Sequence, residues 1–167
     1  MFEIGEWVIY GVHGVCRVTG VEKQLVNRKR TEYLVLEPLS RNESKFYLPT
    51  ANPAAMGKLR RILSAEEMEA LLSSDKVHRD CWIHEENQRK QHYRDLIGSG
   101  DRVSLLQMLW SLYRYQEAQS AAGRKLHQCD DNFLRDAEKL FTSEIALGMD
   151  MTPEEAIAYL RNQLKNT

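Results

Sequence analysis

The sequence has few cysteines, and their spacing argues against sites that cysteine often builds. Three cysteines occur in 167 residues, Cys16, Cys81 and Cys129. They are odd in number and form no CxxC pair, so neither a disulfide framework nor a zinc knuckle is indicated. We expect them to be small apolar thiols inside a protein of a reducing cytoplasm.

A strong charge and a long apolar run are also missing. The formal net charge is −1, so no global field attracts nucleic acid, and any such contact needs a local basic patch. No apolar run approaches the length of a membrane span. The first residues lack the basic start and apolar core of a signal peptide. These observations predict a cytoplasmic protein with no membrane partner.

Catalytic signatures are absent as well. The sequence contains no nucleophile elbow, P-loop or dinucleotide fingerprint. The adjacent carboxylates Glu85 and Glu86, and likewise Asp130 and Asp131, would diverge by about 100° on a helix and share no site. His13 has no second ligand at metal-binding spacing, which favours a turn residue. We therefore predict no enzyme, no catalytic residue, no metal, no cofactor and no small-molecule substrate.

The first fifty residues read as short β-strands separated by turn residues. Their enrichment in branched and aromatic residues predicts strands over 7–10, 14–22, 31–38 and 45–49. Segments 26–32 and 39–45 are expected to be hairpin loops. This number of strands in so short a segment fits a small barrel of the SH3 or Tudor type.

The rest of the chain changes to a helical period. Ser64 with Glu67, Asp101 and Thr152 carry N-cap signals. We therefore predict an α+β protein, with a Tudor/SH3-like β-barrel over 1–52 and a compact helical domain of about five helices over 53–167. The expected helical segments are 64–74, 82–98, 102–123, 129–150 and 152–164.

Aromatic strand residues suggest a binding surface in the β domain. Tyr33, Phe46 and Tyr47 lie on the later strands, and a small barrel can offer an open edge there. Such an edge accepts a partner's strand through main-chain hydrogen bonds, and runs 31–38 and 45–49 suit it best. The alternative is that these aromatic residues only fill the barrel.

A basic segment suggests a second surface in the helical domain. Arg89, Lys90 and Arg94 fall within about one and a half helical turns and could hold phosphates. Alternatively, they form a solvated face paired with nearby carboxylates. Trp82, placed at the start of this helix, is either an apolar wedge against bases or a residue that seats the helix on the bundle.

These motifs, in this order, resemble CarD-like bacterial transcription regulators over nearly the whole chain. The resemblance is carried by "MFEIGEWVIYGVHGVCRV", "EYLVLEP", the Leu48–Pro49 pair with Asn52, "SGD" and "AEKLFTSEIALGM". It implies a Tudor-like domain, similar to that of the transcription-repair coupling factor, which docks on the RNA polymerase β subunit by strand pairing. It also implies a helical domain that contacts promoter DNA and wedges a tryptophan into the minor groove.

The resemblance further implies where the polymerase contacts lie. Two arginines that the family uses against polymerase align with Gln24 and Tyr47. Backbone pairing is therefore expected to persist while the charged contacts differ. The expected polymerase-binding residues are Gln24, Tyr33, Lys45, Phe46 and Tyr47.

The DNA contacts depart further from the family pattern. The wedge tryptophan aligns with Glu86, four residues after Trp82, and a basic DNA-contacting position aligns with Asp131. The expected DNA-binding residues are Trp82, Arg89, Lys90 and Arg94. Two functions stay open: a regulator that stabilises the promoter complex, and a polymerase-docking adaptor whose helices bind another protein.

Overall fold

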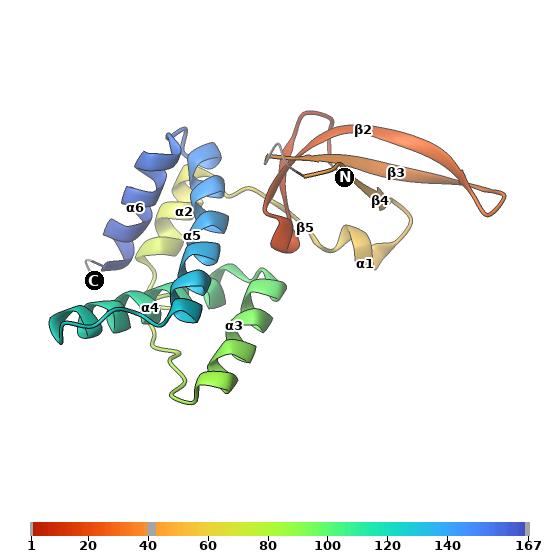
Figure 1. Cartoon of the computed structure of the whole chain (residues 1–167). Helices are drawn as coiled ribbons and strands as arrows, with labels where there is room; N and C mark the ends of the chain where they lie inside the picture. Colours follow the sequence, from red (N-terminus) through yellow and green to blue (C-terminus); the bar gives the residue numbers. More distant parts are fainter. Residues whose placement is uncertain (1, 40–42, 166–167) are drawn as a thin grey trace. The chain divides into compact units, whose positions relative to one another are not determined.

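The computed structural model of the chain describes residues 2–39 and 43–165 and divides into two compact units (Figure 1). Met1–Ile62 form the first unit and Leu63–Thr167 the second. The first unit extends past the boundary expected at residue 52, because a strand missed in the sequence, Leu59–Arg61, pairs with the first strand. We call the two parts the β unit and the helical unit.

The β unit is one antiparallel five-stranded sheet in the order β4-β3-β2-β1-β5. Side chains alternate between its two faces, and one face carries an apolar core that includes Val8, Leu34 and Leu36, all at most 3% exposed. The elements are β1 (Trp7–Tyr10), η1 (Gly11–His13), β2 (Val15–Val26), β3 (Lys29–Pro38), β4 (Phe46–Pro49), α1 (Pro53–Met56) and β5 (Leu59–Arg61).

The hairpin between β2 and β3 is longer than the sequence predicted. Segment 26–32 was expected to be a loop, but pairing continues to Val26↔Lys29. Only Asn27 and Arg28 turn the chain, with φ of 50° and 66°. Positive φ at both central residues is typical of a two-residue type I′ turn, whose twist matches that of the two paired strands. The other predicted loop, 39–45, lies partly outside the described residues.

The helical unit contains the five predicted helices, and the cap signals explain where several begin. Ser64 and Glu67 form a reciprocal capping box at α2, and the Asp101 carboxylate accepts the Ser104 N–H at α4. Leucines and aromatic residues of all the helices share one core. The helices are α2 (Ala65–Ser73), α3 (Glu86–Ser99), α4 (Arg102–Ala121), α5 (Gln128–Gly148) and α6 (Pro153–Lys165).

Helix α3 begins later than the sequence suggested, so Trp82 is not part of it. The Glu85 carboxylate caps α3 by accepting the Gln88 N–H. Before this cap the chain is irregular, and the Cys81 N–H donates to the Ser111 hydroxyl at 2.8 Å. Across the described part of the chain, no helix combines the length and the apolar character needed to cross a membrane.

Candidate functional site

The sheet carries an aromatic surface on the face opposite its core. In the register Val35 lies across from Tyr47, and Tyr33 lies across from Pro49 and Glu22. Thr31 lies two residues before Tyr33 and therefore on the same face of the sheet. Gln24 is the cross-strand partner of Thr31, so Gln24 lies on that face as well. We call this face, with Gln24, Tyr33 and Tyr47, the outer face. Tyr47 is 44% exposed there. Three of the five predicted polymerase-binding residues therefore share one face of the sheet.

Phe46 lies on the opposite face, because it immediately precedes Tyr47 in the strand. Its ring packs against Tyr10, with centroids 5.1 Å apart, and against His13, at 4.5 Å. Phe46 is therefore part of the β-unit packing and not of the outer face. His13 contributes to the same packing, and the described residues hold no group of three metal-ligating side chains.

Among the residues that the structure describes, the edge strand β4 has no pairing partner on its outward side. The Thr50 N–H donates to the Glu32 carbonyl at 3.1 Å, so in an antiparallel ladder Phe46 and Leu48 point their N–H groups toward β3. The N–H and carbonyl of Tyr47 therefore point outward. Pro49 occupies the next outward position, which is where an edge strand tolerates proline.

Run 31–38 is not a sheet edge over most of its length. It forms β3, which lies between β2 and β4, so residues 33–36 have pairing partners on both sides. Only β4 of these two runs is a sheet edge along its whole length. Lys45 directly precedes β4 and is exposed, so its side chain adds a positive charge beside this edge.

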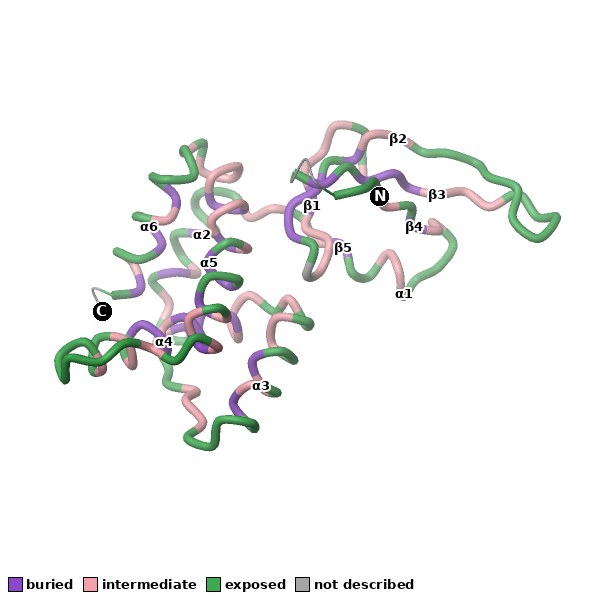
Figure 2. Tube along the Cα trace, viewed as in Figure 1, coloured by how far each residue is buried: buried purple, intermediate pink, exposed green. Residues whose placement is uncertain are grey.

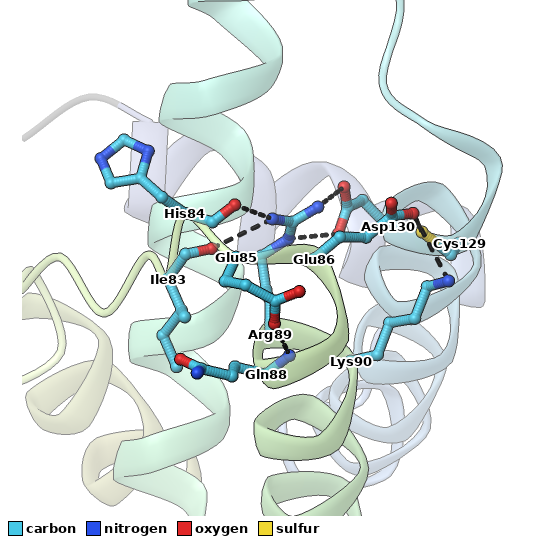
Figure 3. Close-up of polar contacts among 9 residues, drawn as sticks. All are labelled: Ile83, His84, Glu85, Glu86, Gln88, Arg89, Lys90, Cys129 and Asp130. Carbon is cyan, nitrogen blue, oxygen red and sulfur yellow. Dashed lines mark hydrogen bonds and ion pairs between the residues drawn. The ribbon is translucent and has the colours of Figure 1, made fainter.

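Arg89, a predicted DNA contact, lies inside the helical unit (Figure 3). It is 3% exposed, and its Nε and Nη2 donate to the two carboxylate oxygens of Asp130, both at 2.9 Å. Nη1 donates to the carbonyls of Ile83 at 3.0 Å and His84 at 3.3 Å. The hydrogen bonds that Arg89 donates to the Asp130 carboxylate raise the pKa of Arg89. The expected place of Arg89 on a basic surface is therefore corrected: it joins α3 to α5.

Trp82 packs against the bundle. Its ring stacks on Tyr115 with centroids 3.9 Å apart, and the guanidinium carbon of Arg89 lies 4.2 Å from its ring centroid. Such a cation–π contact favours holding the ring where it is. Insertion between bases would break both contacts. The geometry therefore favours the packing interpretation over the wedge.

The remaining basic residues of α3 do not form a patch with Arg89. Lys90 pairs with Glu86 at 3.4 Å, one turn apart. Arg94 is exposed and makes no ion pair with any residue that the structure describes. Glu86, which the resemblance aligned with a wedge tryptophan, is an exposed residue of the first turn of α3. The four predicted DNA contacts thus do not come together on one surface.

The two units differ in net charge. By sequence, the β unit has ten Lys and Arg against six Asp and Glu, a net charge of +4. The helical unit has 13 against 18, a net charge of −5. Several of its arginines also neutralise buried carboxylates: Arg102 pairs with Glu144 and Arg161 with Glu138, each at 2.7 Å. The net positive charge of the chain therefore lies in the β unit.

Much of this charge lies on a feature that the sequence reasoning missed, the end of the β2–β3 hairpin. Residues 23–31, which we call the arm, lie beyond the last contacts with β1 and with the β4 side of the sheet and are two-stranded (Figure 1). The basic residues are visible in the sequence as "VNRKRTE", a segment whose composition predicts a hairpin loop. The arm carries Lys23, Arg28, Lys29 and Arg30.

Comparison with known proteins identifies the β unit. No curated protein matches the chain. Residues 2–63 match the family model of the CarD-like/TRCF RID domain, a range that corresponds closely to the β unit. The β unit therefore belongs to the CarD-like family of RNA-polymerase-interacting domains.

Proposed function

We propose that the chain is a bacterial transcription regulator that binds the β subunit of RNA polymerase through the edge of β4. The observation that carries this proposal is the unpaired main chain of Tyr47 on an edge strand of the RNA-polymerase-interacting domain. A partner strand can pair with this edge and extend the sheet.

Side chains of the outer face supply the specificity of this contact. Tyr33 and Tyr47 present rings of low conformational entropy, and Lys45 adds a positive charge next to the edge. Main-chain pairing does not depend on side-chain identity. The docking mode therefore tolerates Gln24 and Tyr47 at the positions where the resemblance expects arginines.

A matched pair of substitutions at one residue tests the docking mode. Tyr47→Pro removes the outward N–H but spares the hydrogen bonds to β3, whereas Tyr47→Ala keeps the N–H and removes the ring. We expect Tyr47→Pro to weaken binding of the full chain to an immobilised β-subunit lobe more than Tyr47→Ala does. Circular dichroism checks that both variants keep the sheet. Equal binding by the wild type and the proline variant would exclude strand addition at β4.

For the helical unit we propose a protein partner, which makes the chain a polymerase-docking adaptor. The supporting observation is that Arg89 and Trp82 are held inside the unit while its net charge is −5. A negative unit repels the phosphate backbone. The competing function, promoter stabilisation through Trp82, predicts that Trp82→Phe weakens binding to a promoter fork at unchanged thermal stability. We expect no such loss.

A further inference from the structure

We propose that the arm of the β unit binds the phosphate backbone of double-stranded DNA. This inference does not depend on docking at β4, and its test needs no polymerase. It rests on the shape of the arm, on the placement of its charges and on the surroundings of its basic side chains.

The arm is a narrow ribbon whose side chains face solvent. Residues 23–30 are all exposed, and the strands pair directly through Leu25↔Arg30 and Val26↔Lys29 (Figure 2). The major groove of B-form DNA is about 12 Å wide and admits a two-stranded ribbon. The deep, narrow major groove of A-form RNA does not. The shape of the arm therefore favours DNA over duplex RNA.

Positive charges lie on both faces and at the tip. Alternation places Lys23 and Arg30 on one face and Lys29 on the other, while Arg28 lies in the turn. A ribbon that enters a groove has a phosphate backbone on each side. Cations on both faces of the arm fit that geometry. A flat acidic surface of a partner protein would contact only one face of the arm.

These four side chains are free to meet an anion. None of them makes an ion pair with any residue in the described ranges. Glu32 is the cross-strand partner of Lys23, and its carboxylate accepts a hydrogen bond from the Thr50 hydroxyl at 3.0 Å. The helical unit differs, because five of its basic residues are paired: Arg89, Lys90, Arg102, Arg135 and Arg161.

The turn supports the same interpretation. Arg28 has φ of 66°, a left-handed conformation that glycine adopts at lower cost. An arginine at this position makes the turn less stable than a glycine would. It also places a positive charge at the point of the arm that would enter the groove first. Leu25, 73% exposed, and Val26, 40% exposed, flank the charges and could contact thymine methyl groups.

Fluorescence anisotropy with the full chain and a short labelled DNA duplex of mixed sequence tests the proposal. The test variant is Arg28→Gln/Lys29→Gln/Arg30→Gln. The matched control, Arg94→Gln/Arg124→Gln/Lys125→Gln, removes the same number of exposed charges from the helical unit. All six positions are exposed, so both triple variants are expected to fold. Thermal melting checks that they do.

We expect the wild type to bind the duplex at low salt and the arm variant to bind at least about tenfold more weakly. Each phosphate contact contributes about −0.9 to the slope of log affinity against log salt, so removing three lowers its magnitude by up to about 2.7. The control variant is expected to keep most of the affinity and the slope.

Three results would overturn the proposal. One is the absence of DNA binding by the wild type at low salt. Another is a loss of affinity in the control variant as large as that in the arm variant. The third is a duplex RNA of the same length that competes as well as DNA. Polymerase binding, measured separately with the Tyr47 variants, can fail or succeed without changing any of these outcomes.

Discussion

The two units of the chain use charged residues in opposite ways. In the helical unit three carboxylates are at most 3% exposed, Asp130, Glu138 and Glu144, and each is bound by an arginine. In the described part of the β unit no charged or polar side chain is buried, and the core is apolar. The β unit instead places unpaired cations on the arm. The comparison shows that the burial and pairing of a charged side chain indicate whether it stabilises the fold or is available to a partner. The number of charged residues in a segment indicates this less well.

Removing the buried arginine should produce the largest effect on stability. Arg89→Ala leaves the Asp130 carboxylate buried without a counter-ion and frees the carbonyls of Ile83 and His84. Breaking one partner of a buried pair costs about 3–5 kcal/mol. We expect a loss of that size in the free energy of unfolding measured with urea.

Two further variants sharpen this prediction. Arg94→Ala, an exposed arginine of the same helix, should change the free energy of unfolding by less than about 0.5 kcal/mol. The double variant Arg89→Met/Asp130→Leu should recover much of the loss, because it removes both charges. A small effect of Arg89→Ala would mean that Asp130 is not buried in solution.

The Arg89–Asp130 pair also shows where sequence reasoning stops. The apolar periods predicted the five helices and four of the strands, and Ser64 and Asp101 predicted helix starts, because these signals are local. The partner of Arg89 lies 41 positions away, and no local pattern indicates such a contact. The arm was missed for a different reason. Both faces of its ribbon meet solvent, so its residues lack the alternation that marks a half-buried strand.

The apolar core of the β unit should give the next largest effect. Leu36→Ala removes a fully buried side chain and leaves a cavity, which costs about 2–5 kcal/mol. Leu25→Ala is the same substitution on the arm, where the side chain is 73% exposed, and should cost little. Urea unfolding followed by far-ultraviolet circular dichroism compares the two. Similar losses would show that the arm is packed against another surface in solution.

The buried hydroxyl of Tyr113 should contribute less. It donates to Glu138 at 2.6 Å, and Arg161 continues to bind Glu138 when the hydroxyl is removed. A hydrogen bond to a charged group contributes about 1.5–3 kcal/mol, so Tyr113→Phe should cost about that or slightly less. Exposed Tyr47→Phe is the matched control.

The same substitution has a pH dependence of known sign. Burial, with the hydrogen bond to Glu138, raises the pKa of Tyr113 in the folded protein. The unfolded chain therefore ionises first, and stability that is present below about pH 10 is lost as pH rises above it. The wild type should lose free energy of unfolding more steeply there than Tyr113→Phe. Parallel curves would show that Tyr113 is accessible to solvent.

A substitution in the turn of the arm should change stability with the opposite sign, and it separates folding from binding. Arg28→Gly introduces the residue that the turn favours, because glycine tolerates φ of 66° without a Cβ penalty. We expect the β unit to gain up to about 1 kcal/mol in free energy of unfolding while the chain loses affinity for duplex DNA. Arg28→Lys keeps the charge and the strained conformation, so it should leave both quantities nearly unchanged. A stabilised glycine variant with full DNA affinity would show that the charge in the turn has no part in binding, and that the arm acts through Lys23, Lys29 and Arg30 alone.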